Sequence, residues 1–176
     1  MLSFAQLDIP SELCSSFKDF KEPTPIQACT WPPALKGLDV VGIAETGRQV
    51  AYFQPCLAIC SKILYSGKTL AFGIPALSRL IALPKPSSKK TAPTVSVLVV
   101  APTRELAIQT HDTLSALGAP FGIASVAVFG GVPKDGQIQM LKNANKGKDG
   151  LTTRIIVGTP GRILDLMQEG VCDLSG

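Results

Sequence analysis

The chain has 176 residues, of which 45% are hydrophobic and 17% charged, with a formal net charge of +4. This length and apolar content suit a single soluble domain with a buried core, and so mild a positive charge is compatible with a polyanionic partner without indicating one. Polar residues interrupt the longest apolar stretches, which argues against a membrane span. The sequence therefore favours a soluble globular protein.

The numbers and positions of the cysteines and the histidine limit the kinds of site that we expect in this chain. The five cysteines are odd in number, form no Cys-x-x-Cys pair and follow no secretory leader, so we expect a reducing intracellular compartment, no disulfide partner and no metal site. The one histidine, His111, leaves triad chemistry without an obvious base, and we interpret it as structural or solvent-facing.

Predicted helices and strands alternate along the chain. A short helix over residues 11–20 comes first, then a turn at Pro23 and Pro25 and a second helical stretch ending near Gly37. Near-continuous apolar runs predict buried parallel strands at residues 40–44, 95–101, 123–129 and 154–158. Helical patterns lie between and after them at residues 67–82, 103–117, 134–144 and 160–169. This order predicts an α/β fold with a doubly wound parallel sheet.

Two halves of a phosphate-binding loop follow the first predicted strand. Ala44-Glu45-Thr46-Gly47 stands before residues 48–65, and Ser66-Gly67-Lys68-Thr69 stands after them. Removing the 18 intervening residues would join the halves into a Walker A sequence, in which backbone N–H groups and the lysine bind phosphates and the threonine coordinates Mg²⁺. The strand pattern before the halves and the helix pattern after them disfavour a chance Gly-Lys-Thr tripeptide.

Residues 48–65 are unlike a hydrophilic surface insertion. They hold both tyrosines and two of the cysteines, and apolar residues recur at 53, 57, 60 and 64 with roughly helical spacing. Closing a longer loop costs only about 0.6 kcal/mol per doubling of length, but the phosphate turn needs Gly47 and Ser66 as neighbours. We therefore interpret the segment as an insertion or unspliced sequence, which sequencing of the mature transcript would test.

Polar motifs also follow the other three predicted strands, at the edge where open sheets bind ligands. They are Pro102-Thr103-Arg104-Glu105-Leu106, Gly130-Gly131 and Thr159-Pro160-Gly161-Arg162. Thr103 and Thr159 are candidate helix caps beside N–H groups that could bind nucleic-acid phosphates. The alternative is that the first and last motifs are an ordinary helix start and turn, with Arg104 and Arg162 paired to structural carboxylates. Their occurrence together beside a phosphate loop favours the functional reading.

These motifs, together with Phe20–Gln27, resemble the first RecA-like domain of DEAD-box ATP-dependent RNA helicases, in the family's order. The resemblance implies a RecA-like sheet that is incomplete at the C-terminus, with residues 1–37 as the nucleotide-recognition segment and 38–176 as a partial ATP-binding domain. Wider similarity, for example at Trp31-Pro32, resembles the nucleolar branch that assists large ribosomal subunit assembly. That branch implies a place in the nucleus or nucleolus and action on pre-ribosomal RNA in rRNA processing. We also expect a monomer.

The resemblance also implies roles for individual residues, with ATP and Mg²⁺ as cofactors. Gln27 would recognise adenine, helped by Thr24 and by stacking on Phe20. Lys68 would bind the β and γ phosphates and Thr69 the Mg²⁺, which makes these two the catalytic pair. Further nucleotide contacts would come from Ala44, Glu45, Thr46, Gly47, Ser66 and Gly67. The RNA sugar-phosphate backbone would be held, independently of base sequence, by Thr103, Arg104, Gly131, Thr159, Gly161 and Arg162.

The sequence stops before the position of the family's Asp-Glu-Ala-Asp motif, and no second RecA-like domain follows it. We therefore expect negligible ATP hydrolysis and no strand separation by this polypeptide alone. Three hypotheses stay open. The chain is the leading part of an RNA helicase, a non-catalytic RNA-binding module, or a disrupted product that does not fold stably.

Overall fold

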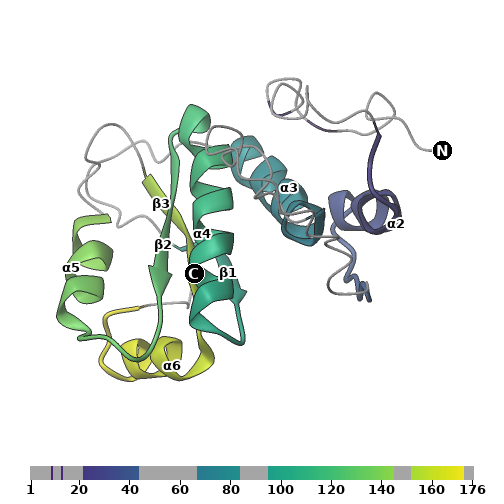
Figure 1. Cartoon of the computed structure of the whole chain (residues 1–176). Helices are drawn as coiled ribbons and strands as arrows, with labels where there is room; N and C mark the ends of the chain where they lie inside the picture. Colours follow the sequence, from purple (N-terminus) through teal and green to yellow (C-terminus); the bar gives the residue numbers. More distant parts are fainter. Residues whose placement is uncertain are drawn as a thin grey trace, which may run out of the picture. The chain divides into compact units, whose positions relative to one another are not determined.

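The structure is a computed structural model that describes residues 9, 13, 22–43, 67–83, 95–144 and 152–172. The chain divides into two compact units, residues 1–79 and 80–176. Its described elements, in order, are α2 (Pro25–Leu35), α3 (Gly67–Ala82), β1 (Val97–Val100), α4 (Arg104–Gly118), the 3-10 helix η3 (Ala119–Phe121), β2 (Ile123–Val128), α5 (Asp135–Ala144), β3 (Thr152–Gly158) and α6 (Pro160–Gln168) (Figure 1).

The second unit contains a three-stranded parallel sheet in the order β1-β3-β2. The central strand, β3, pairs with β1 from Val97↔Ile155 to Val100↔Gly158. It pairs with β2 from Ile123↔Thr152 to Val128↔Gly158, with a register shift between Ala124 and Ser125. Parallel neighbours need a crossover connection, and α4 and α5 lie in the two connections between these strands. The predicted α/β fold with a parallel sheet is confirmed.

Helices pack against both faces of this sheet. Neighbouring side chains of a strand point to opposite faces, so β2 contacts helices on both sides. Ser125 of β2 faces α4, where its hydroxyl contacts His111 and Ser115. The opposite face forms a core with α5 and α6, whose buried members are Val126, Val128, Leu141, Ile156, Ile163, Leu166 and Cys172. In Figure 1, α4 and α5 lie to either side of β2.

In the first unit, side chains of α2 bind backbone groups in the first turn of α3. Gln27 Nε2 donates to the Gly67 carbonyl oxygen at 3.2 Å, and Trp31 Nε1 donates to the Leu70 carbonyl oxygen at 3.1 Å. Gln27 and Trp31 are four residues apart and therefore lie on one face of α2. Both are buried, and the buried residues Leu70, Ile74 and Leu77 continue that core along α3.

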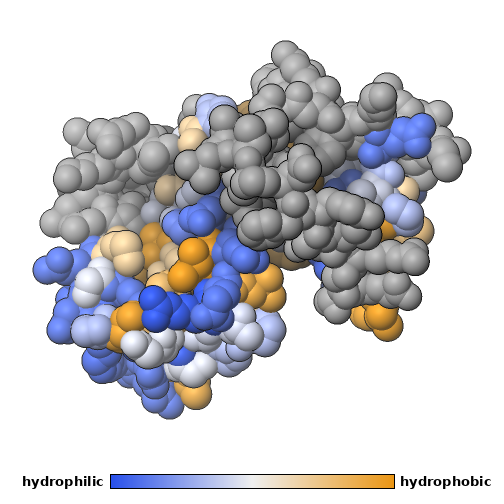
Figure 2. Space-filling view, viewed as in Figure 1, coloured by the Kyte–Doolittle hydropathy of each residue, from blue (hydrophilic) through white to orange (hydrophobic). Residues whose placement is uncertain are grey.

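The strand predicted at residues 40–44 is wrong over its described part. Residues 38–43 form no strand, and Val41 and Ile43 are 92% and 94% exposed. The orange atoms at the lower right of Figure 2 lie where Figure 1, in the same view, draws the exposed end of this segment after α2. An apolar run becomes a strand only when its N–H and C=O groups pair with a neighbouring strand, and the described sheet is built from β1, β2 and β3.

The other predicted strands and helices that fall within the described residues are confirmed to within a few residues. Of the helix predicted over residues 11–20, only Leu13 is described, and it is helical and fully buried. Residues 48–65 and the polar connection at 84–94 lie outside the described residues. The 3-10 helix η3 was not predicted. Among the described helices, none has both the length and the apolar character to cross a membrane.

Candidate functional site

Five of the residues predicted to bind the nucleotide are described, and all five belong to the first unit. They are Thr24, Gln27, Gly67, Lys68 and Thr69. The others lie outside the described residues: Phe20, Ala44, Glu45, Thr46, Gly47 and Ser66.

Gln27 connects the beginning of α2 to the beginning of α3. Its Oε1 accepts a hydrogen bond from the Thr24 N–H at 2.9 Å, and its Nε2 donates to the Gly67 carbonyl oxygen at 3.2 Å. A Cβ added at Gly67 would lie 3.3 Å from Thr24 Oγ1 and 3.7 Å from Gln27 Nε2, so glycine is the residue that fits closely here. The structure thus brings Thr24, Gln27 and Gly67 together.

Lys68 and Thr69 lie in the first turn of α3. Lys68 is half-buried and lines a cavity of about 470 Å³ whose other walls come from Ile26, Thr30, Ala34, Val40, Gly42, Ile43, Ala71 and Phe72. Thr69 is 5% exposed. A long helix that begins with glycine and lysine offers N–H groups and a cation to an anion, which fits the phosphates of a nucleotide. For Mg²⁺, these residues supply the Thr69 hydroxyl, and phosphate oxygens would complete the coordination.

The six residues predicted to hold a nucleic-acid backbone all belong to the second unit. Their motifs follow Val100, Val128 and Gly158, which are the last residues of the three strands. Gly158 is in register with both Val100 and Val128, so the three strands end side by side. The sheet therefore places the three polar motifs at one edge, as the sequence predicts.

The two predicted helix caps use their hydroxyl groups differently. Thr103 Oγ1 accepts a hydrogen bond from the Leu106 N–H at 3.2 Å, so it caps α4 as predicted. Thr159 stands at the N-cap position of α6 without a side-chain bond to its own helix. Its Oγ1 instead accepts from the Gly130 N–H at 3.3 Å, which ties the start of α6 to the loop after β2. The first N–H groups of a helix have no partner within the helix, so those of α6 can bind another acceptor.

Two glycines shape this edge for different reasons. Gly131 has φ +81, a left-handed conformation that favours glycine, and no atom lies within 4 Å of a Cβ built on it. A Cβ at Gly158 would lie 2.5 Å from the Val128 carbonyl oxygen and 3.0 Å from Ile163 Cγ1. The absence of a side chain at Gly158 thus lets α6 begin directly against the end of β2, whereas Gly131 leaves its backbone accessible.

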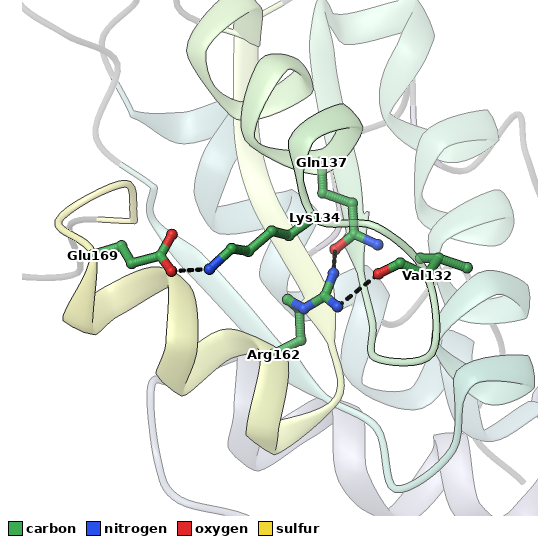
Figure 3. Close-up of polar contacts among 5 residues, drawn as sticks. All are labelled: Val132, Lys134, Gln137, Arg162 and Glu169. Carbon is green, nitrogen blue, oxygen red and sulfur yellow. Dashed lines mark hydrogen bonds and ion pairs between the residues drawn. The ribbon is translucent and has the colours of Figure 1, made fainter.

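The two arginines of the motifs bind neutral groups. The Arg104 guanidinium carbon lies 4.9 Å from the centroid of the Phe129 ring. Arg162 donates from Nη1 to Gln137 Oε1 and from Nη2 to the Val132 carbonyl oxygen, both at 2.9 Å (Figure 3). Within the described residues, the alternative that both pair with structural carboxylates is therefore wrong. Both guanidinium groups keep a positive charge that can attract phosphate.

A separate ion pair connects the beginning of α5 to the end of α6. The Lys134 ammonium group donates to a Glu169 carboxylate oxygen, and this hydrogen bond raises the pKa of Lys134 (Figure 3). Both side chains are well exposed. The pair therefore contributes little to stability but lies beside the Arg162 contacts.

Sequence reasoning missed Gln137, which is 4% exposed in the first turn of α5. Its Nε2 donates to the Phe129 carbonyl oxygen at 3.1 Å, and its Oε1 accepts from the Phe129 N–H at 3.2 Å. One signal was available in the sequence. Gln137 stands four residues before the buried Leu141 and so falls on the apolar face of α5, where a polar side chain needs a partner.

His111 has a structural environment. Its Nδ1 lies 2.7 Å from Ser125 Oγ, which also lies 3.0 Å from Ser115 Oγ. Burial lowers the pKa of the imidazole below its usual value of 6.5, and the neighbouring Asp112 carboxylate opposes this shift only in part. A neutral imidazole hydrogen-bonded to a serine agrees with the structural interpretation from the sequence.

Comparison with known sequences points to one family. The profile described as DEAD/DEAH box helicase matches residues 65–175. The ATP-dependent RNA helicase dbp3 of Schizosaccharomyces pombe is 46% identical over 99% of this chain and 25% of its own length. DBP3 of Saccharomyces cerevisiae is 43% identical over 99% of this chain and 27% of its own length. The chain thus spans about a quarter of the length of the curated relatives it matches.

Solved structures that resemble this chain belong to the same family of helicases. The RNA helicase Prp28 from Chaetomium thermophilum, bound to ADP, matches with a TM-score of 0.72 and 29% identity over 99% of this chain and 36% of that chain. A DEAD box protein from Methanococcus jannaschii matches with a TM-score of 0.69 and 26% identity over 99% of this chain and 39% of that chain.

Proposed function

Because the chain belongs to the DEAD/DEAH box helicase family, we propose that it forms part of an ATP-dependent RNA helicase and binds both ATP and the RNA backbone. The observation that carries this proposal is the meeting of three polar motifs where the three strands end. In open α/β sheets, ligands bind beyond the carboxyl ends of the strands.

RNA binding is assigned to this edge of the sheet. It presents the Arg104 and Arg162 guanidinium groups, the accessible backbone at Gly131 and the beginnings of α4 and α6. Cations, backbone N–H groups and hydroxyl groups bind phosphate and sugar oxygens, which are the same at every nucleotide whatever its base. Binding should therefore depend strongly on salt and weakly on RNA sequence.

ATP binding is assigned to the first turn of α3 and the start of α2. Lys68 and the N–H groups of the first turn would hold phosphates, Thr69 would hold Mg²⁺, and Gln27 with Thr24 would contact the adenine. When bound, ATP supplies the phosphoryl-transfer free energy that RNA remodelling needs. The residues of this chain bind and orient it.

The proposal extends to a cellular role. The sequence resembles the nucleolar branch of the family around Trp31-Pro32, and this resemblance supports action on pre-ribosomal RNA in the nucleolus during ribosome biogenesis. One observation favours a second candidate function. Since residues 48–65 separate Gly47 from Ser66, the chain as it stands can act as an RNA-binding module that does not turn over ATP.

Fluorescence anisotropy with a labelled single-stranded RNA tests the RNA site. Arg162→Ala should weaken binding by about 10-fold and lower the slope of log K against log[salt] by about 1. Arg154→Ala is a matched control, because it removes the same charge from β3 near its opposite end, where Arg154 Nε donates to Ser96 Oγ. Equal losses in the two variants would contradict a site at the carboxyl edge.

A further inference from the structure

Gln137 stands at the centre of the contacts around Arg162. Its amide makes two hydrogen bonds with one residue: Nε2 donates to the Phe129 carbonyl oxygen at 3.1 Å, and the Phe129 N–H donates to Oε1 at 3.2 Å. Phe129 follows the last residue of β2 directly. The end of a strand therefore fixes both the position and the plane of the Gln137 amide.

The fixed amide in turn holds Arg162. Gln137 Oε1 accepts a second hydrogen bond, from Arg162 Nη1 at 2.9 Å, while Arg162 Nη2 donates to the Val132 carbonyl oxygen at 2.9 Å (Figure 3). Two acceptors on two nitrogens fix the plane of a guanidinium group. Of its five N–H donors, contacts within the described residues use two, which leaves three that can bind a phosphate.

We propose that Gln137 is a positioning residue of the RNA site, which acts by holding the Arg162 guanidinium in the orientation that receives a phosphate. This inference rests on the proposed function. A side chain that is ordered before binding loses less conformational entropy when the ligand arrives. An amide is suited to this role, since it orients the guanidinium without neutralising its charge, as a carboxylate would.

A double-mutant cycle on RNA affinity tests the role, using the whole chain and labelled single-stranded RNA. Gln137→Leu has a similar size and removes all three hydrogen bonds of the amide. It should weaken RNA binding by about 5-fold to 10-fold in the wild-type background and by less than about 2-fold when Arg162→Ala is already present. Gln139→Leu, at an exposed position of the same helix, is the matched control and should change affinity by less than about 2-fold.

The cycle separates positioning from a general loss of structure, which would weaken binding equally in both backgrounds. Circular dichroism melting identifies variants that do not fold. If Gln137→Leu is one of them, Gln137→Asn takes its place, because its shorter side chain keeps an amide but cannot reach both Phe129 and Arg162.

Three outcomes overturn the inference. The first is a folded Gln137→Leu variant that binds RNA as tightly as the wild type. The second is a Gln137→Leu substitution that lowers RNA affinity equally in the wild-type and Arg162→Ala backgrounds. In both cases, a loss of affinity in Arg162→Ala alone leaves the proposed function standing. If Arg162→Ala itself binds RNA like the wild type, the proposed contact of Arg162 with RNA is wrong, and the role of Gln137 is wrong with it.

Discussion

The hydroxyl of Thr159 accepts a hydrogen bond from the backbone N–H of Gly130, although the two residues are 29 positions apart in the chain. This bond joins two motifs that the sequence shows only as separate strand ends. It places the start of α6 against the loop after β2, where Arg162 also binds the Val132 carbonyl oxygen. The candidate RNA site is thus one connected structure.

The first prediction concerns this bond. Thr159→Val keeps the shape of the side chain but removes the acceptor of the Gly130 N–H, so we expect the free energy of unfolding to fall by about 1 kcal/mol. Thr159→Ser keeps a hydroxyl and should lose less. Urea unfolding followed by circular dichroism measures both variants, and equal losses would show that the hydroxyl is not the stabilising group.

The second prediction concerns Gly158. A Cβ at this position would lie 2.5 Å from the Val128 carbonyl oxygen, and backbone cannot move aside cheaply. Gly158→Ala should therefore destabilise the second unit by about 1–3 kcal/mol. Gly136→Ala is the control, since no atom lies within 4 Å of a Cβ there. Because Gly136 is the second residue of α5, in its first turn, alanine should stabilise the helix by less than about 0.5 kcal/mol, and the two variants should shift the unfolding midpoint in opposite directions.

The third prediction concerns the pH dependence of stability. Burial lowers the pKa of His111 in the folded protein below 6.5, so the unfolded chain binds more protons between the folded-state pKa and 6.5. The free energy of unfolding should therefore decrease as pH falls through this window, and the full stability should be present above it. Urea unfolding from about pH 5 to about pH 8 measures the effect.

His111→Gln is the matching variant, because an amide can still bond Ser125 but does not titrate. Its stability should change less than that of the wild type over the same pH range. Identical pH profiles for the two proteins would assign the effect to other groups.

The fourth prediction concerns residues 48–65. A chain without them joins Gly47 to Ser66 and restores a continuous phosphate loop. It should bind ATP about 10-fold more tightly than the present chain, equivalent to about 1.4 kcal/mol, as measured by isothermal titration calorimetry. Lys68→Ala in the shortened chain should remove the gain. No gain on deletion would mean that the two halves do not form one nucleotide site.

Much of the second unit follows from local sequence patterns. Apolar runs and helical periodicity correctly located β1, β2, β3 and the helices α4 to α6, because these residues bury the same faces that the patterns indicate. The edge that carries the three polar motifs was also predictable, since parallel strands end together. Thr103 is a further case, because a cap acts within its own helix and needs no distant partner.

The same patterns fail wherever a residue depends on a partner far along the chain. Residues 40–43 have the composition of a buried strand but remain exposed, since a strand exists only through hydrogen bonds to a neighbouring strand. The apolar face of α5 indicates that Gln137 needs a partner, but only the structure shows that Phe129 and Arg162 are its partners. Composition and periodicity indicate which faces of the helices and strands are buried. The partners of buried polar groups depend on how distant segments pack together, and a short stretch of sequence does not contain that information.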